Sequence, residues 1–374
     1  MRIAIITETY LPSTDGIVTR LTRAVDYLSK QGHQVLVIAP AIPGLPRSDH
    51  QVEIQGARTF TFFLYKERPW ALPDPRIKQW LADFQPDLVH AVNPASLTAA
   101  GVHYAKRLKI PLIASFHTNL PDYADRYHFS FVKPVLWRYL RHLHNQASLN
   151  LVTSQAMYDL LDQHGIHDLA ILPKGVAIED RHPHFYSSQM RQTLMGEDRD
   201  KKLLLFVGRL AHEKEIDSLR SLFDRRQDIC LAIVGDGPAR THLETVFAGT
   251  PTVFTGFLHG EALSQAYASA DAFIFPSRSE TLGLVITEAM ASGIPVIAAE
   301  SEPTLEQVRH ERTGLIYQTE DIGSLDRAID QLDDAVLVET LKKSGRQYAE
   351  GFSWEHASQA LEAAYQETIR RVYQ

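Results

Sequence analysis

Short apolar runs and amphipathic stretches alternate along the first 40 residues of the chain. The runs Arg2–Thr7 and Val35–Ala39 have the composition of strands buried in a parallel sheet. Between them, apolar residues recur every three or four positions, the period of one helix face, at Val18, Leu21, Val25 and Leu28. Gly32 follows, where the C-terminal cap of a helix belongs. A strand, a helix and a strand at this spacing predict a β–α–β unit.

The same alternation continues and then restarts in the second half of the chain. Further strands are predicted at Leu88–Val92, Pro111–Ser115, Leu149–Thr153 and Leu169–Leu172. After the polar stretch 187–201, four more are predicted at Leu203–Val207, Leu231–Val234, Ala272–Phe275 and Pro295–Ala298. This pattern predicts an α/β protein with two doubly wound, Rossmann-like domains that face each other across a cleft. We expect the domains to be 1–173 and 174–353, with a final helix at about 354–374 that packs back on the first domain.

Composition limits the class of protein. The chain has 374 residues, of which 44% are hydrophobic and 22% charged, as in ordinary globular proteins. It has no apolar run long enough to span a membrane, its N-terminus reads as a strand and not as a signal peptide, and Cys230 is its one cysteine. These features predict a cytoplasmic protein. The net charge of −7 argues against a nucleic-acid partner, and the histidine pairs lack a zinc spacing, so no metal is expected.

Two features of the first domain lie where parallel strands end. The loop TETYLPSTDGIVTRL follows the first predicted strand and opens a helix at Gly16. The N–H groups at that helix start could approach an anionic or polar ligand, or Asp15 could simply cap the helix. His117 follows the strand Pro111–Ser115 and is either a site residue or a structural histidine.

Two basic residues, Arg209 and Lys214, lie where the first strand of the second domain gives way to a helix. A guanidinium and an ammonium group at such a turn suit a diphosphate, although both could be solvated charges. The later G-D-G-P turn at 235–238 indicates by itself only a turn before a helix.

Two carboxylates, Glu280 and Glu288, lie on either side of a predicted helix start. Carboxylates accept hydrogen bonds from vicinal hydroxyls, as sugars and riboses present them, but these two could equally be solvated. Free N–H groups at the helix start could meet a phosphate. They belong to Thr281, Leu282, Gly283 and Leu284.

These motifs together resemble a known family. The pair E-x7-E after a P-S-x-x-E loop, with the G-R-x-x-x-E-K and G-D-G-P turns, is similar to the family 4 retaining glycosyltransferases of GT-B fold. The resemblance implies that Glu280 contacts the donor sugar, that Glu288 holds the ribose, and that Arg209 and Lys214 bind the diphosphate. It places His117 near the transferred sugar and makes Gly16 a site candidate. It also implies a nucleotide sugar as substrate, no cofactor and no metal.

A narrower resemblance is carried by longer segments. "GIVTRLTRAVDYL", "VNPASL", "SFVKPVLWRYLRHLHNQA" and "FTGFLHGEALSQAYASADAFIFPSRSETLGLVITEAMASG" resemble the sulfoquinovosyldiacylglycerol synthases of cyanobacteria and chloroplasts. This resemblance implies transfer of sulfoquinovose from its UDP derivative to diacylglycerol. Two positions depart from the pattern. The stretch Glu300–Thr304 replaces a Gly-Gly-x-Pro segment with acids, which are odd neighbours for a sulfonate, and Ala177 replaces an aspartate.

A basic and aromatic stretch from Arg126 to Tyr158 contains no Asp or Glu. Such a segment could lie on an anionic bilayer or be a core helix with solvated ends. If the segment lies on a bilayer, the side of the protein that faces the membrane and the acceptor includes Lys133, Trp137, Arg138 and Arg141.

The sequence therefore predicts a metal-independent, retaining hexosyltransferase, peripheral on the cytoplasmic face of a membrane, with a nucleotide-sugar donor and a lipid acceptor. The specific hypothesis is sulfoquinovosyl transfer to diacylglycerol. The alternatives are a relative that uses a neutral hexose (an α-glucosyl, α-mannosyl or galactosyl transferase), a sugar-nucleotide epimerase of the same fold, a nicotinamide oxidoreductase and a non-catalytic binding protein. The missing G-x-G-x-x-G fingerprint disfavours the oxidoreductase.

Overall fold

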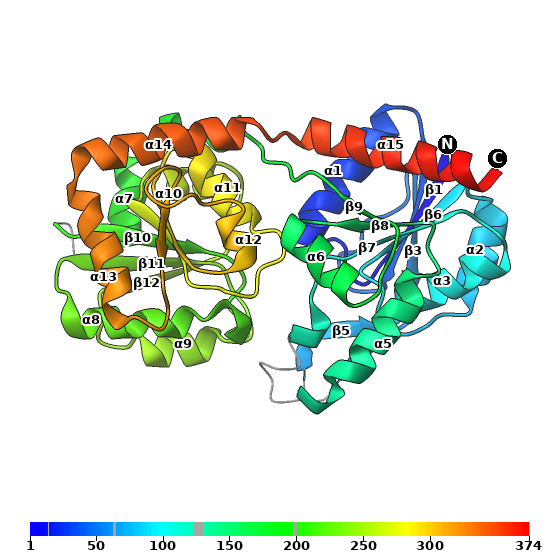
Figure 1. The fold of residues 1–374 in the computed structure, drawn as a ribbon, viewed down its shortest axis with the longest axis horizontal. Coiled ribbons are helices and arrows are strands. Elements are labelled where there is room, and N and C mark those ends of the chain that lie inside the picture. The colour runs from blue at the N-terminus through cyan, green and yellow to red at the C-terminus, as the bar shows by residue number, and fades with distance from the viewer. Residues whose placement is uncertain (14, 63–64, 123–129, 197–199, 374) are drawn as a thin grey trace. The chain divides into compact units, whose positions relative to one another are not determined.

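The structure, a computed structural model, describes residues 1–13, 15–62, 65–122, 130–196 and 200–373. The chain divides into two compact units (Figure 1). Unit 1 comprises Met1–Gly175 together with Trp354–Gln374, and unit 2 comprises Val176–Ser353. The last helix therefore belongs to the unit that contains the N-terminus.

Unit 1 is built on a seven-stranded sheet in which every neighbouring pair is parallel, in the order β3-β2-β1-β6-β7-β8-β9. The strands are β1 (Arg2–Thr7), β2 (Gln34–Pro40), β3 (Val52–Ala57), β6 (Leu88–Val92), β7 (Leu112–Ser115), β8 (Leu149–Val152) and β9 (Leu169–Ile171). An antiparallel hairpin pairs β4 (Thr59–Phe62) with β5 (Tyr65–Ala71). The helices are α1 (Gly16–Lys30), α2 (Arg76–Phe84), α3 (Leu97–Arg107), α5 (Lys133–His144), α6 (Gln155–Gln163) and α15 (Trp354–Tyr373).

Unit 2 is built on a six-stranded parallel sheet in the order β12-β11-β10-β13-β14-β15. Its strands are β10 (Lys202–Val207), β11 (Ile229–Val234), β12 (Thr252–Gly256), β13 (Ala272–Phe275), β14 (Val296–Ala299) and β15 (Leu315–Tyr317). Its α-helices are α7 (Ser188–Met195), α8 (Leu222–Arg225), α9 (Arg240–Val246), α10 (Gly260–Ala268), α11 (Leu284–Ala291), α12 (Glu302–Leu305), α13 (Ile322–Asp330) and α14 (Ala335–Glu350). Both sheets are doubly wound, so the predicted fold class is confirmed.

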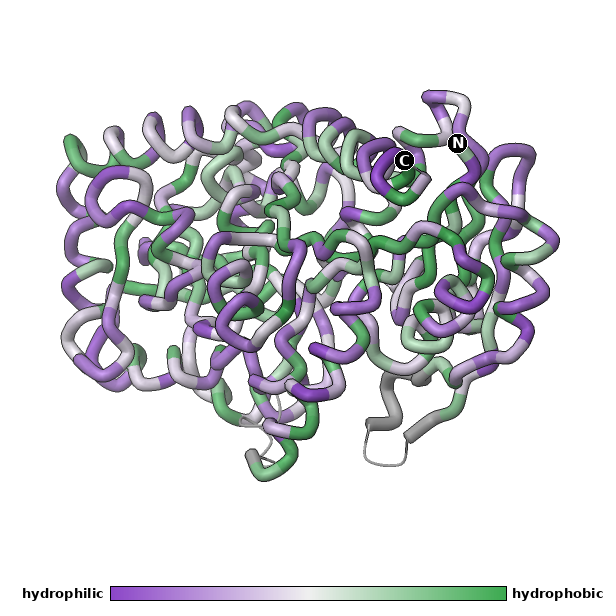
Figure 2. The backbone as a smooth tube through the Cα atoms, turned by 45° about the vertical axis from the view of Figure 1, so that its right-hand side comes forward, coloured by the Kyte–Doolittle hydropathy of each residue, from purple (hydrophilic) through white to green (hydrophobic). Residues whose placement is uncertain are grey.

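The central strands of each sheet are buried on both faces, which explains their continuous apolar runs. Hydrophobic residues gather along the strands inside each unit, whereas hydrophilic ones prevail on the outer helices (Figure 2). Side chains also define where helices begin. The Asp15 carboxylate accepts hydrogen bonds from the N–H groups of Ile17 and Val18 at the start of α1, and Ser154 caps α6 in the same way.

The C-terminal helix α15 is held on unit 1 by apolar and polar contacts. Leu361 and Tyr365 are buried in the cluster that includes α1 and β1. Glu362 lies 2.9 Å from Nε2 of His33 and accepts a hydrogen bond of 3.1 Å from the hydroxyl of Tyr27. This packing follows from the three- and four-residue spacing of the apolar positions in the helix.

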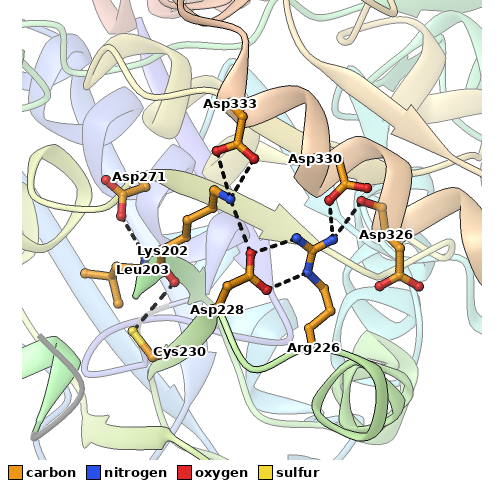
Figure 3. A network of polar contacts seen from close by, with 9 residues as sticks. All are labelled: Lys202, Leu203, Arg226, Asp228, Cys230, Asp271, Asp326, Asp330 and Asp333. Carbon is orange, nitrogen blue, oxygen red and sulfur yellow. Dashed lines mark hydrogen bonds and ion pairs between the residues drawn. The ribbon is translucent and has the colours of Figure 1, made fainter. Parts of the chain in front are cut away.

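A network of ion pairs covers the amino-terminal end of two strands of unit 2 (Figure 3). The ammonium group of Lys202 lies 3.3 Å from Asp228 and 2.9 Å from Asp333. The Arg226 guanidinium contacts Asp228 at 2.8 Å and Asp330 at 2.6 Å. Parallel sheets bind ligands at the carboxyl ends of their strands. This network lies at the opposite end of the sheet, where it contributes to stability.

Candidate active site

The loop that carries Arg209 and Lys214 leaves β10 at its carboxyl end and forms a short 3₁₀ turn at His212–Lys214. The N–H of Leu210 in this loop donates to the carbonyl of Asp236 at 3.0 Å. A side chain at Gly235 would place its Cβ 1.9 Å from the carbonyl oxygen of Gly208, and Gly235 has a φ of +136°. The G-D-G-P turn is therefore more than a turn before a helix, because its first glycine lets two loops cross closely and fixes the loop of Arg209.

Both basic residues are paired with carboxylates of unit 2. Nζ of Lys214 lies 2.6 Å from Oε2 of Glu280, and both side chains are about one-fifth exposed. The Arg209 guanidinium pairs with the buried carboxylate of Glu213. The structure thus brings Lys214 and Glu280 together, although they are far apart in sequence. The two basic residues are not simply solvated.

The Glu280 carboxylate is held ionised by its surroundings. Burial alone would raise the pKa of Glu280, but the Lys214 ammonium and the N–H groups of Thr281 and Gly283 hold it below its ordinary value. The N–H of Thr281 donates to Oε1 of Glu280 at 3.2 Å. The expectation of free N–H groups across 281–284 is therefore wrong for Thr281 and Gly283, because the neighbouring carboxylate accepts from them. Leu282 lies two residues before α11, and Leu284 is the first residue of that helix.

Glu288 lies about one turn into α11, which begins with Leu284. The Tyr267 hydroxyl donates to its Oε2 at 3.0 Å, and the Arg181 guanidinium lies 3.7 Å from its Oε1. The side chain of Glu288 is 23% exposed, and carboxylate oxygens accept several hydrogen bonds each. Glu288 is thus held in place and still able to accept hydrogen bonds from a ligand.

Sequence patterns did not identify the residues that orient Glu288. Tyr267 belongs to α10, and Arg181 follows a turn at the start of unit 2. Arg181 also donates to Oγ of Ser264 at 3.0 Å and lies over the Tyr267 ring, with its Cζ 5.5 Å from the ring centroid. Neither residue lies at the end of a strand, and the quoted segment that contains Tyr267 gives it no role, so only the folded arrangement reveals them.

The site candidates of unit 1 also lie at the carboxyl ends of strands. Gly16 is the first residue of α1, and Asp15 caps the helix as the simpler alternative expected. His117 follows β7 and is 8% exposed. The backbone N–H of His117 donates to Oδ1 of Asn93 at 3.2 Å. The ring nitrogen Nε2 of His117 lies 2.9 Å from Oγ of Ser115. Burial lowers the pKa of His117 well below its ordinary value, and the charge of the nearby Arg20 guanidinium adds to this effect.

The basic stretch forms α5, with one exposed and one buried side. Lys133 is half-buried, and Arg138 and Arg141 are exposed. Trp137 is 8% exposed and stacks on His164 with ring centroids 3.7 Å apart, so its expected place on a membrane-facing surface is wrong. Arg126 and Phe129, which belong to the same expected surface, lie outside the described residues.

Neither a metal centre nor a membrane-spanning helix is found among the residues that the structure describes. Within the described ranges, no three or more His, Cys, Asp or Glu side chains come together as they would around a metal ion. No helix in this part of the chain is both long and apolar enough to cross a membrane.

Comparison with known proteins identifies the family. Residues 14–180 match the family described as Glycosyltransferase Family 4, and residues 194–348 match Glycosyl transferases group 1. A sulfoquinovosyl transferase of Arabidopsis thaliana is 36% identical over 92% of this chain and 69% of its own length. The chain belongs to the family 4 glycosyltransferases of GT-B fold. It is therefore an enzyme that transfers a hexose from a sugar nucleotide.

Other relatives of this glycosyltransferase differ in the sugar or acceptor that their names give. A GDP-mannose-dependent alpha-mannosyltransferase of Mycolicibacterium smegmatis is 37% identical over 86% of this chain and 85% of its own. An alpha-monoglucosyldiacylglycerol synthase of Streptococcus pneumoniae is 27% identical over 86% of this chain and 76% of its own. The fold is matched by a sucrose-phosphate synthase of Thermosynechococcus elongatus, with a TM-score of 0.79, 20% identity and 99% of both chains covered.

Proposed function

We propose that this glycosyltransferase moves sulfoquinovose from UDP-sulfoquinovose to diacylglycerol with retention of the α configuration. The observation that carries the proposal is the 36% identity to a sulfoquinovosyl transferase over nearly the whole chain. A diacylglycerol acceptor is supported by a second relative, whose name gives a glucosyldiacylglycerol product. Unit 2 would bind the donor and unit 1 the acceptor.

Each site residue has a role in this proposal that its surroundings support. Glu288, held by Tyr267, would accept hydrogen bonds from the ribose, and Glu280 would contact the sugar. Arg209 and Lys214 would stabilise the charge that develops on the diphosphate as the sugar leaves. Since two cations and backbone N–H groups can serve this purpose, the proposal requires no metal.

A second candidate donor is a neutral hexose, and the end of β14 favours it. Glu300 and Glu302 are exposed there, at the start of the short helix α12. Two carboxylates after the carboxyl end of β14 would repel a sulfonate if the donor sugar reaches them. The relative that uses GDP-mannose shows that such donors occur among close homologues.

A panel of donors tests the proposal. The protein is incubated with diacylglycerol and, in turn, UDP-sulfoquinovose, UDP-glucose, UDP-galactose or GDP-mannose, and the lipid product is identified by mass. We expect sulfoquinovosyldiacylglycerol, with nucleotide released only when the lipid is present. A lipid product from one of the neutral donors alone would replace sulfoquinovose with that hexose. Conversion of the nucleotide sugar without any lipid product would favour the epimerase alternative.

We further propose that the exposed side of α5 contacts an anionic membrane surface. Phe131, in the turn just before α5, is 77% exposed, and Val135 and Tyr139 of the helix are 68% and 41% exposed. Arg138 and Arg141 are exposed at neighbouring positions. Arg138, Arg141, His142, Asn145 and Gln146 also line a shallow depression of the surface. Exposed apolar groups beside cations are typical of helices that lie at a bilayer interface.

Replacing Lys133, Arg138 and Arg141 together with serine should weaken sedimentation with anionic liposomes. Each basic residue near such a surface contributes on the order of 1 kcal/mol, so the partition coefficient should fall by about a hundredfold. Raising the salt from about 0.1 M to 1 M shortens the Debye length from about 10 Å to 3 Å and should release the parent protein as well.

A control variant with the same change in charge replaces Lys78, Lys106 and Arg107, which are exposed on α2 and α3. It should sediment like the parent, and both triple variants should keep their affinity for the nucleotide sugar. Equal loss of binding in the two variants would show that net charge, and not the surface of α5, controls attachment.

A further inference from the structure

A line of buried hydrogen bonds leads from His117 to the C-terminal helix within unit 1. Nε2 of His117 lies 2.9 Å from Oγ of Ser115, and the same oxygen lies 2.8 Å from Nε2 of His90. Nδ1 of His90 lies 2.7 Å from the hydroxyl of Tyr365 in α15. The four side chains are at most 8% exposed. The line therefore connects a candidate site residue after β7 with a helix that is about 250 positions later in the sequence.

Both imidazoles of this line are neutral near pH 7. Burial, with a smaller contribution from the charge of Arg20, lowers the pKa of His90 to about 3. The same two causes lower the pKa of His117, with smaller contributions from His90 and His144. A neutral imidazole has one N–H and one acceptor nitrogen, so the hydrogen bond at one ring nitrogen fixes the direction of the hydrogen bond at the other.

The direction is set by Tyr365. Its hydroxyl is fully buried, and in the part of the chain that the structure describes its one hydrogen-bond partner is His90. If the hydroxyl donates to Nδ1 of His90, then Nε2–H of His90 donates to Ser115. The Ser115 hydroxyl has one proton, and among the described residues only Nε2 of His117 is left to accept it, so Ser115 donates to His117. The opposite order leaves the tyrosine proton without an acceptor among the described residues, and an unpaired buried donor is costly.

We propose that Tyr365 is a positioning residue that acts through His90 and Ser115 to hold His117 in the tautomer with its proton on Nδ1. In this state Nε2 of His117 accepts a hydrogen bond from Ser115, and the other ring nitrogen is a donor that cannot take up a proton. In the transfer reaction, His117 would then not act as a general base. That last step rests on the proposed function, whereas the tautomer does not.

Long-range ¹H–¹⁵N correlation spectra of the protein with ¹⁵N-labelled histidine test the proposal, because protonated and unprotonated ring nitrogens have distinct shifts. The signals of His117 are those lost in His117→Gln. We expect the Nδ1–H form to dominate in the parent by about fivefold or more, from the cost of the unpaired donor. In Tyr365→Phe neither direction satisfies every group, so the preference should fall towards equal populations.

Tyr27→Phe is the matched control, because it removes another hydrogen bond between a tyrosine hydroxyl and α15 without touching the line. It should leave the His117 signals as in the parent. If Tyr365→Phe does not fold, Ser115→Ala interrupts the line at its middle and should equally reduce the preference. A parent with its His117 proton on Nε2, or an unchanged tautomer in the folded variant used, would overturn the proposal. Because the readout needs no turnover, these outcomes are independent of the donor panel.

Discussion

Lys214→Ala should lower the rate of sugar transfer by about tenfold to a thousandfold, the range seen when one preorganised charge-stabilising group is removed from an active site. Lys214 lies in the loop after β10, with its ammonium group 2.6 Å from Glu280. In our proposal this ammonium stabilises the charge that grows on the leaving diphosphate, which is greatest in the transition state. The measurement is the initial rate of nucleotide release with donor and lipid both present. Arg209→Ala should have an effect in the same range.

Lys202→Ala provides the control, since it removes a paired lysine from the other end of the same strand (Figure 3). That variant should lose some stability and keep its rate once folded. Equal rates for the two lysine variants would return Lys214 to the role of a structural partner of Glu280. A strict requirement for added Mg²⁺ or Mn²⁺ would contradict the assignment of the diphosphate to side chains.

The strands in the interior of each sheet could be predicted from sequence, whereas several edge strands could not. Buried parallel strands such as β1 and β10 appear as continuous apolar runs because both faces are covered. The strands β3, β12 and β15 were missed, and all three lie at a sheet edge. Their burial is partial or their length is three residues, so they leave a weak pattern. The hairpin β4–β5 and the helix α7 in the polar stretch 187–201 were missed as well.

The candidate site was predictable to the extent that it follows the ends of strands. Arg209, Lys214 and Glu280 lie in loops at the carboxyl ends of β10 and β13, where the topology of an open sheet concentrates ligand contacts. Their pairing, and the support of Glu288 by Tyr267, depend on side-chain positions that no spacing encodes. Trp137 shows the same limit, because an aromatic residue among basic ones gives the same sequence pattern whether its helix face is exposed or buried.

Acidification should destabilise unit 1 between about pH 6.5 and pH 4, because it buries neutral histidines. Burial lowers the pKa of His90 to about 3 and that of His144 to about 4, from an ordinary 6.5. In this window the unfolded chain binds more protons than the folded one, so the free energy of unfolding rises with pH. At about 1.4 kcal/mol for each pKa unit, each of the two histidines should cost on the order of 2 kcal/mol at pH 5 relative to pH 7.5.

Tryptophan fluorescence during urea unfolding isolates this effect, since all four tryptophans of the chain (Trp70, Trp80, Trp137 and Trp354) belong to unit 1. The free energy of unfolding followed in this way should be lower at pH 5 than at pH 7.5 by about 4 kcal/mol from His90 and His144 together.

His144→Gln should reduce this dependence by about 2 kcal/mol, because glutamine does not titrate and its amide can still donate to Asn150, whose Oδ1 lies 2.8 Å from Nδ1 of His144. His103→Gln, at an exposed position on α3, should leave the dependence as in the parent. If the parent were as stable at pH 5 as at pH 7.5, the buried histidines would have to take up protons without cost, and a charged His90 or His117 would be incompatible with the hydrogen-bond line that ends at Tyr365.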